Sequence, residues 1–485
     1  MPVSDAVPGV RMGTAAGRWV LLATILGSGM AMLDATVVNV ALGTIGRDFG
    51  AGFAGLQWTL NGYTLTLAAL ILLGGSLGDS YGRRRVFVLG TVWFAVASLL
   101  CGVAGNIETL VAARALQGIG GALLTPGSLA LISASFDPRD RGAAVGAWSG
   151  LGGVAGAAGP FVGGWLVEQV SWRAVFLVNL PLAALVVWVA LRHVPESRDP
   201  QAAPALDVGG ASLAALGLAG VTYGLISSSP PAAVVGVLAL AGFVLVERRS
   251  RHPLVPLELF SSSLFVAANL VTLVVYAAIT SVFFLLVLQL QVVSGFSPLA
   301  AGAAALPVTA LMLLLSARAG ALAQRIGPRL PMTIGPLLAA AGLLLMLRVG
   351  ARASYLVDVL PAVGVFGLGL SCLVAPLTAT VLGAAPGHLA GTASGVNNAV
   401  ARTAGLLAVA ALPVVVGLSG NDYTDPVAFG SGFRAAMTIS AGLLVLGAVV
   451  AAVLVGNPQE HRHAVPVERQ PHCGISAPAA HPEVR

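Results

Sequence analysis

The stretch GSLGDSYGRR, residues 75–84, follows a long apolar run and ends in basic side chains. A related stretch, GALAQRIGPR, occupies residues 320–329 and also follows an apolar run. At one constant offset the two share four residues, which are Gly75/Gly320, Leu77/Leu322, Gly82/Gly327 and Arg84/Arg329. A second set of matching glycines supports the alignment, namely Gly142/Gly391 and Gly146/Gly395. The chain therefore contains an internal repeat in parallel order.

Charged residues are scarce in the sequence as a whole. Only 9% of the 485 residues are charged, 57% are hydrophobic, and the mean hydropathy is +0.91. A soluble globular protein has about 25% charged residues, and a chain this apolar cannot hide its apolar side chains from water. The composition excludes an ordinary soluble enzyme, a disordered regulator and a nucleic-acid binder, despite the net charge of +6. It predicts a protein of the lipid bilayer.

Apolar runs of sufficient length predict membrane-spanning helices, because an ~30 Å hydrocarbon core needs about 20 helical residues. The sequence contains fourteen such runs, of which the eighth is short. They lie at roughly 19–42, 56–77, 86–105, 109–134, 142–167, 174–191, 208–227, 232–246, 264–289, 298–317, 331–347, 355–381, 393–418 and 433–455. The first is too long for the apolar region of a signal peptide and carries Asp34, so we expect an uncleaved helix.

The two repeat copies follow the second and the tenth predicted helix. This placement predicts an all-α polytopic membrane protein with two six-helix bundles and two inserted linker helices. Such duplicated bundles are typical of transporters, with the substrate site at the repeat interface near the middle of the bilayer. The expected divisions are a cytoplasmic tail at 1–18, a first bundle at 19–192, a linker with helices seven and eight at 193–260, a second bundle at 261–456 and a disordered cytoplasmic tail at 457–485.

Arginine placement orients the predicted helices across the cell membrane. With the N-terminus inside, eighteen arginines fall on the cytoplasmic side and five on the opposite side. Positively charged loops remain in the cytoplasm. We therefore expect both termini to be cytoplasmic.

The sequence lacks the residues that several kinds of chemistry require. The sequence contains no Lys, which excludes a P-loop, and with it an ATP-driven pump within this chain, and also excludes Schiff-base chemistry. Its three cysteines form no CxxC pair, so we expect neither a disulfide framework nor a zinc site. All histidines lie outside the predicted spans, which makes an intramembrane enzyme or a sensor a remote alternative. His461, His463, His472 and Cys473 in the tail are weak candidates for a metal site, and a solvated tail is the better interpretation, so we expect no metal and no cofactor.

Asp34 and Arg114 are charges within the predicted membrane spans. Asp34 lies about 22 Å into the bilayer at ~1.5 Å per residue, and Arg114 lies about 8–10 Å below the outer surface on a helix that runs inward. These depths agree, so the two side chains can pair. A lone carboxylate there costs several kcal/mol unless it is paired, hydrated or protonated.

A rocking motion that changes either the burial of Asp34 or its distance from a guanidinium can make it take up and release a proton. We interpret Asp34 as the proton carrier and Arg114 as the residue that tunes it. A static ion pair and a substrate contact are the alternatives.

Four motifs in order resemble the major facilitator superfamily, in its fourteen-helix drug:proton antiporter branch. They are LDATVVNVAL from Leu33, GSLGDSYGRR from Gly75, LVAARALQGIGGA from Leu110 and AGAAGPFVGG from Ala155. Ala155 replaces a glycine of the family pattern, and Gln324 stands in the second loop copy where Asp79 stands in the first. The resemblance covers nearly the whole chain. It implies proton-coupled export of amphipathic small molecules such as antibiotics by alternating access, with the proton gradient as the energy source.

The resemblance also implies a gating loop, formed by Gly75, Asp79, Gly82, Arg83 and Arg84. In the family the matching carboxylate faces the start of the thirteenth helix, here near Gly391, and a carboxylate there is stabilising by ~0.3–1 kcal/mol. We expect Arg83 or Arg84 to pair with Asp137 or Asp140 in the next cytoplasmic loop. These contacts would hold the cytoplasmic side shut in the outward-facing state. Topology alone explains Arg85.

The fifth predicted helix carries the antiporter motif, formed by Gly156, Gly159, Pro160, Gly163 and Gly164. Small residues allow close backbone approach, and proline kinks a helix. Generic tight packing explains the glycines equally well. The pair Gly159-Pro160 resembles exporters, and it implies a seal between the bundles that stops proton leakage. It disfavours one alternative, a proton-coupled importer with this fold, whereas a proton-coupled exporter of a specific endogenous metabolite remains an alternative.

Other polar residues within the spans are candidates for a substrate cavity. They are Asn39, Asn61, Tyr63, Gln117, Tyr276, Asn398 and Arg402. Arg402 shares a helix face with Asn398, as either a cavity wall or part of a packing network. Two arginines against one aspartate favour neutral or weakly acidic hydrophobic substrates over multiply charged cations. We expect a monomer whose partners are the lipid bilayer, a hydrophobic small molecule and protons, without nucleic acid.

Overall fold

A computed structural model of the chain describes residues 10–198, 207–250, 253–386 and 389–456. These residues form fourteen helical segments long and apolar enough to cross a membrane, which confirms the predicted number. Within the described ranges, no strand forms beyond one isolated bridge between Val10 and Phe136. The fold is all-α.

The first six spans are α1 (Ala15–Phe49), α2 (Phe53–Tyr81), α3 (Arg83–Gly102), α4 (Ile107–Ser135), α5 (Pro138–Gln169) and the consecutive pair α6 (Ala174–Leu177) and α7 (Asn179–His193). The inserted spans are α8 (Val208–Ile226) and α9 (Pro230–Arg249), followed by the short turn η1 (Leu257–Ser261). The last six are α10 (Ser263–Val292), α11 (Pro298–Ala303) with α12 (Leu306–Ile326), α13 (Arg329–Leu345) with η2 (Met346–Arg348), η3 (Tyr355–Val359) with α14 (Leu360–Gly383), α15 (Ala390–Val415), and α16 (Pro426–Leu454) after η5 (Asp422–Thr424).

Most helices extend beyond the apolar runs that predict them, because polar residues cap their ends. The hydroxyl of Thr14 accepts a hydrogen bond from the Gly17 amide, so α1 begins at Ala15. The eighth span is not short, because Pro230 suits the first helical position and the helix continues to Arg249. The predicted disorder at 457–485 lies outside the described residues, as do residues 1–9.

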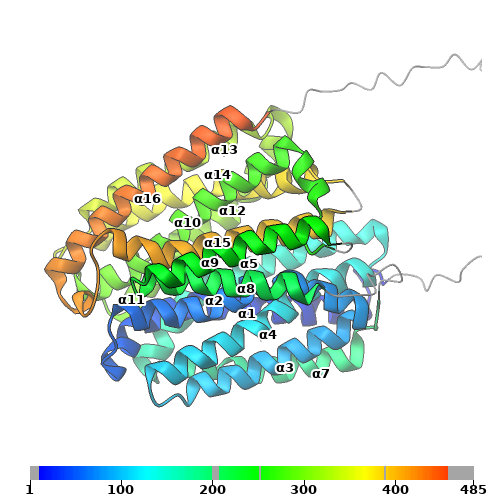
Figure 1. Ribbon diagram of the computed structural model, residues 1–485, viewed down its shortest axis with the longest axis horizontal. Helices are drawn as coiled ribbons and strands as arrows, with labels where there is room; N and C mark the ends of the chain where they lie inside the picture. Colours follow the sequence, from blue (N-terminus) through cyan, green and yellow to red (C-terminus); the bar gives the residue numbers. More distant parts are fainter. Residues whose placement is uncertain (1–9, 199–206, 251–252, 387–388, 457–485) are drawn as a thin grey trace, which may run out of the picture.

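Equivalent helices pack in the same way in the two halves. In the first half α4 packs on α2 and α3, while α1 packs on α5 and α7. In the second half α14 packs on α12 and α13, while α10 packs on α15 and α16. Figure 1 shows these halves side by side, with α8 and α9 lying along the seam, where α8 packs on α2 and α15 and α9 packs on α8. The structure therefore confirms the parallel repeat of two bundles with two inserted helices.

The repeated loop itself adopts the same conformation twice. Gly82 lies between α2 and α3 with φ of 113°, and Gly327 lies between α12 and α13 with φ of 86°. Only glycine adopts such angles without strain. This requirement explains why both copies of the motif keep this residue.

The two ends of the molecule differ in how the halves meet. We call the end with the Gly82 loop the Arg83 end, and the end where α2 begins the Phe53 end. At the Phe53 end the amide of Phe53 donates to Gly420 O over 2.6 Å, and the Tyr423 hydroxyl donates to Ala51 O over 2.7 Å. Burial raises the pKa of Tyr423 above its usual value, so this donor stays protonated at neutral pH.

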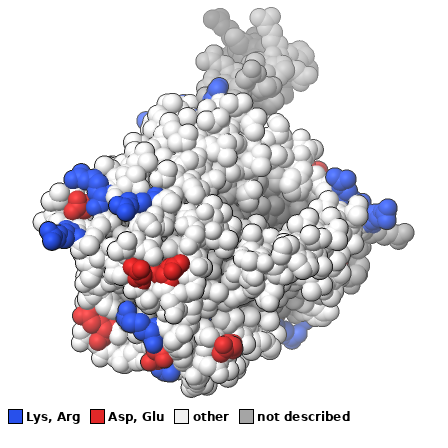
Figure 2. Space-filling view, turned by 60° about the vertical axis from the view of Figure 1, so that its left-hand side comes forward, with Lys and Arg blue, Asp and Glu red and all other residues white. Residues whose placement is uncertain are grey.

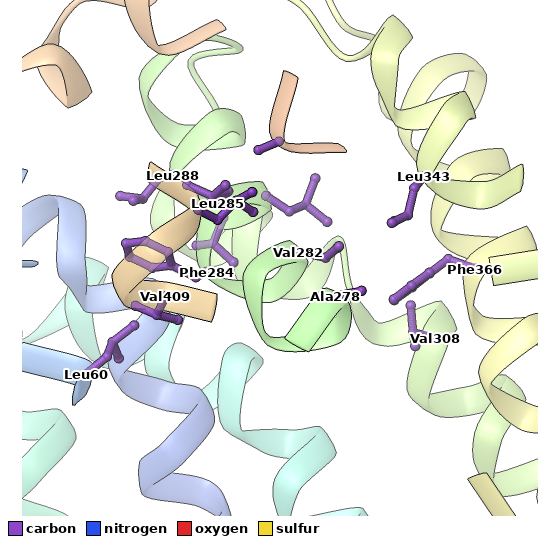
Figure 3. Close-up of a cluster of buried hydrophobic side chains, with 14 of the residues drawn as sticks. Leu60, Ala278, Val282, Phe284, Leu285, Leu288, Val308, Leu343, Phe366 and Val409 are labelled. Carbon is purple, nitrogen blue, oxygen red and sulfur yellow. The ribbon is translucent and has the colours of Figure 1, made fainter. Parts of the chain in front are cut away.

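Apolar packing reinforces the contact at the Phe53 end. The largest hydrophobic cluster includes residues of both halves. In Figure 3, Leu60 of α2 and Val409 of α15 lie close to Phe284 and Leu288 of α10. On the outer surface, Figure 2 shows a broad area without charged side chains, with acidic and basic groups gathered towards its margins. This distribution suits a chain surrounded by lipid.

Candidate functional site

A cavity of 410 Å³ lies between the halves at the Arg83 end. Residues of α2, α4 and α5 and the start of α3 line it from the first half, and residues of α15 line it from the second. Pro253, Leu254 and Pro256, which follow the inserted helix α9, complete the wall. Because the halves are bonded to each other at the Phe53 end, this cavity is the space available to a ligand that enters from the Arg83 end.

The predicted gating loop forms part of the cavity wall. Gly75, Asp79 and Arg83 line the cavity together with Gly391 of α15, which agrees with the expected neighbourhood of the thirteenth span. Asp79 Oδ1 forms an ion pair with Arg83 at 2.8 Å, across the Gly82 turn that joins α2 to α3. In this structure the charge of Asp79 is thus paired within its own half.

Arg83 and Arg84 do not pair with Asp137 or Asp140 in this structure, where a cavity lies at the Arg83 end. The pairing expected for the outward-facing state stays a prediction. Arg84 is close to Glu196, with Nε and Oε2 3.7 Å apart, and its amide donates to Glu196 Oε1 over 3.0 Å. Asp137 instead caps α5 by accepting from the Arg139 amide, and Asp140 accepts from the Met12 amide. The two carboxylates thus bond to backbone amides of α5 and of the N-terminal segment, whereas Glu196 bonds to the start of α3.

Glu196 is a residue that the sequence interpretation missed. The segment after α7 returns across the start of α3, where Ser197 O accepts from the Arg83 amide over 2.9 Å. The carboxylate therefore meets the positive N-terminus of α3, a favourable arrangement for an acidic side chain. The available signal was a single carboxylate within the arginine-bearing stretch RHVPESR at 192–198.

Asp34 and Arg114 form the buried pair that their depths predicted. Asp34 Oδ2 and Arg114 Nη1 are 2.5 Å apart, and the side chains are 0% and 1% exposed. Arg114 also donates to Thr59 O over 3.1 Å and lies over the Tyr63 ring, 4.5 Å from its centroid. The guanidinium is therefore held from α1 and α2 as well as by its own helix.

Neutral side chains complete the surroundings of Asp34. Gln117 Nε2 donates to Asp34 Oδ1 over 2.8 Å, and Asn179 Nδ2 of α7 donates to the same oxygen over 3.2 Å. Gln117 Oε1 accepts from Arg114 over 2.6 Å, and Gln117 Nε2 also lies 2.8 Å from Ser98 Oγ of α3. The sequence interpretation did not identify Ser98 and Asn179, although each is a polar residue within an apolar span.

Gln117 does not line the cavity, contrary to the prediction. None of Asp34, Arg114 and Gln117 is among the lining residues, and all three are buried inside the first half. Gly118 and Gly121 explain this, because they let α4 approach the backbone and ring of Tyr63 on α2. Tyr63 is itself buried, and it lies beside the ion pair.

The antiporter motif packs on two partners. A side chain at Gly159 or Gly163 would collide with Thr36 or Val37 of α1, within the first half. A side chain at Gly164 would reach Leu299 Cα and Pro298 O of α11, in the second half, at 2.6 Å. Gly156 lies against Met32 of α1, and the Pro160 carbonyl lies against Gly302 of α11. Only part of the motif therefore faces the interface between the halves.

The other residues predicted to line a cavity lie in different environments. Asn398 lines the cavity, whereas its neighbour Asn397 donates to Thr272 and Asn269 of α10, within the second half. Asn39 donates to Ala35 O of its own helix over 3.4 Å. Asn61 is buried, and its Nδ2 has no hydrogen-bond partner. Tyr276 and Arg402 are half-buried.

Metal ligands are not clustered in the described part of the chain, where no group of three or more His, Cys, Asp or Glu side chains could hold an ion. The tail residues His461, His463, His472 and Cys473 lie outside the described residues. The polar centre in the described chain is therefore the Asp34 network.

Comparisons with known proteins agree with this arrangement. A family model described as Major Facilitator Superfamily matches residues 24–410. The chain is 37% identical over 408 residues to the tetracenomycin C resistance and export protein of Streptomyces glaucescens, covering 82% of this chain and 75% of that protein. It is 36% identical over 468 residues to puromycin resistance protein pur8 of Streptomyces alboniger, covering 91% and 92%.

A solved structure has the same fold. It is a bacterial homolog of the human lysosomal transporter Spinster, in an inward-facing and unoccupied conformation, with a TM-score of 0.63 and 18% identity. The match covers 91% of this chain and 98% of that one.

Proposed function

The chain belongs to the major facilitator superfamily, and on that premise we propose that it is a proton-coupled exporter of amphipathic small molecules such as antibiotics. The names of the similar curated proteins support export, since they include an antibiotic resistance and export protein and a puromycin resistance protein. In this proposal the two bundles rock about the substrate and expose it to each side of the membrane in turn.

The Arg83 end faces the cytoplasm in this proposal, and both termini lie there. Fourteen described arginines lie in loops or helix ends on that side, which are Arg11, Arg18, Arg83, Arg84, Arg85, Arg139, Arg141, Arg192, Arg198, Arg248, Arg249, Arg318, Arg325 and Arg329. The Phe53 end has only Arg47, Arg173, Arg348, Arg352 and Arg434. This asymmetry supports the orientation, and it lets the cavity collect a compound from the cytoplasm.

The observation that supports proton coupling is the buried ion pair between Asp34 and Arg114. An ionised carboxylate inside a membrane protein is costly unless a cation and hydrogen-bond donors compensate for lost water. Protonating Asp34 would not leave Arg114 alone, because Thr59 O, Gln117 Oε1 and the Tyr63 ring still surround it. The site therefore tolerates both charge states of Asp34, as a proton carrier must.

In this proposal a shift of helices inside the first half, coupled to the rocking of the two halves, gives Asp34 access to protons. The network joins α1, α3, α4 and α7 within the first half, so a shift of α1 against α4 alters it. A proton that crosses the membrane with the potential supplies ~2.3 kcal/mol per 100 mV. This free energy drives the return to the state that binds substrate.

The test compares Asp34→Asn with the wild-type protein in proteoliposomes carrying an imposed proton gradient, using a panel of antibiotics. We expect Asp34→Asn to fold and to lose gradient-driven transport, because the amide cannot carry a proton. Glu108→Gln, which changes an exposed carboxylate on α4, should transport normally. Full gradient-driven transport by Asp34→Asn would overturn the carrier role, and wild-type export that survives an ionophore would overturn proton coupling.

A further inference from the structure

Arg402 is the second arginine within the membrane, and its surroundings differ from those of Arg114. It lies near the middle of α15 and is half-buried. Across the described residues, its guanidinium has no hydrogen bond and no carboxylate within ion-pair distance, whereas Arg114 has both. An uncompensated cation at this depth is costly.

No acidic side chain of the described spans is placed to neutralise Arg402. Asp34 is the only carboxylate far from the helix ends, and Arg114, Gln117 and Asn179 already bond to it. The others lie at the ends of their helices, where Asp79 pairs with Arg83 and Asp358 lies 3.7 Å from Arg348. The positive charge of Arg402 is therefore available to a ligand.

Arg402 also lies between the two halves. Its helix α15 packs against α2 of the first half as well as against α10 of its own half. On α15, the residues Gly391, Gly395 and Asn398 line the cavity. Arg402 follows them by eleven, seven and four residues, close to whole turns of an α-helix, so it continues the same stripe beyond the lined part of the cavity.

We propose that Arg402 binds an acidic group of the exported compound, so that the preferred substrates are hydrophobic organic acids with a carboxylate or an acidic phenol. This inference rests on the proposed export function and names its substrate class. A guanidinium donates two parallel hydrogen bonds to a carboxylate, and such charge-assisted bonds are the stronger ones. The cavity wall supplies apolar contacts through Ile71, Leu72 and Leu129.

The test measures binding to the purified protein in lipid nanodiscs at neutral pH. The probes are fluorescent aromatic carboxylic acids, such as pyrenebutyric acid, each paired with its neutral primary amide. We expect the wild-type protein to bind the acids more tightly. In Arg402→Gln the affinity for the acids should fall about 10-fold to 100-fold, the effect of losing a charged hydrogen-bond partner, whereas the affinity for the amides should not change.

Arg318→Gln is the matched control, because Arg318 is exposed on α12 and donates only to Leu314 O in its own helix. It should bind both members of each pair like the wild-type protein. Arg402→Lys should recover part of the acid binding, which separates a role of charge from misfolding. Equal wild-type affinity for acid and amide, absent acid binding, or equal weakening of both by Arg402→Gln would each overturn the inference.

Transport separates this inference from the proposed function. If the wild-type protein exports the amides as well as the acids, the export function stands and the acid preference is wrong. If the acids bind through Arg402 but the proton gradient drives no export, acid recognition stands and the exporter proposal is wrong.

Discussion

Asp34 shows how several neutral side chains sustain one buried charge. Its two oxygens receive hydrogen bonds from Arg114, Gln117 and Asn179, which come from two other helices. Gln117 is central, because it bonds to both members of the ion pair and to Ser98. Removing one partner from such a network leaves buried polar atoms without hydrogen bonds, which costs more than the average bond contributes.

Gln117→Leu should therefore destabilise the protein by about 1–3 kcal/mol. Leucine has a similar volume, so lost polar contacts rather than a cavity cause the effect. The measurement is the thermal unfolding midpoint in detergent. Ser128→Ala is the control, because the buried Ser128 hydroxyl bonds only to Leu124 O in its own helix and its loss should matter less. Equal midpoints for the two variants would contradict this account of the network.

Helix α5 links the two halves through two different faces. Gly159 and Gly163 allow it to lie directly against α1, while Gly164 allows α11 to approach from the second half. Next to that contact Glu168 Oε2 accepts from the Leu299 amide over 3.2 Å. The glycine motif thus serves both packing inside the first half and the contact between the halves at the Phe53 end.

Gly164→Val should open the contact between α5 and α11. The atoms that the new side chain would meet belong to the backbone, at 2.6 Å, so they cannot rotate away as a flexible side chain would. Overpacking of this kind costs about 1–3 kcal/mol. We expect lower export and a lower unfolding midpoint. Gly153→Ala is the control, because a side chain there has no atom within 4 Å. Wild-type behaviour of Gly164→Val would show that this approach is not needed.

In the molecule as a whole, hydrogen bonds join the two halves at the Phe53 end, and a cavity separates them at the Arg83 end. Gln57 Nε2 donates to Val409 O over 2.7 Å, and Gln291 Nε2 donates to Val40 O over 3.0 Å. All these bonds must break if the cavity is to open towards the Phe53 end. Alternating access therefore predicts that a covalent lock there stops the cycle without closing the cavity.

A cysteine pair at Gly52→Cys and Asn421→Cys should form such a lock. A side chain at Gly52 would lie 3.8 Å from Asn421 Oδ1, so the side chains at these two positions reach each other across the halves. In a background without the native cysteines, oxidation should stop export and preserve ligand binding from the Arg83 end. Reduction should restore export. A pair at Gly52→Cys and Gly105→Cys, both in the first half, serves as the control. Continued export by the oxidised lock would contradict this motion.

Much of the fold and part of the site followed from local sequence. The fourteen spans, the repeat and the depth match of Asp34 with Arg114 depend on hydropathy and on residue spacing along single helices. The partners of Arg84, the position of Gln117 and the different environments of Asn397 and Asn398 did not follow. Each depends on how a helix is rotated and on which distant segment packs against it, and adjacent helical residues point about 100° apart.

The sequence by itself determined that this chain spans a membrane as two repeated bundles, because the cost of placing charge in hydrocarbon acts on every residue separately. It also marked Asp34, Arg114 and Arg402 as the charges that need an explanation. Only the tertiary structure decided that Arg114 has a carboxylate and hydrogen-bond acceptors beside it, whereas Arg402 has neither among the described residues. That difference arises from contacts between helices distant in sequence, which place a carboxylate beside one guanidinium and leave the other between the two halves.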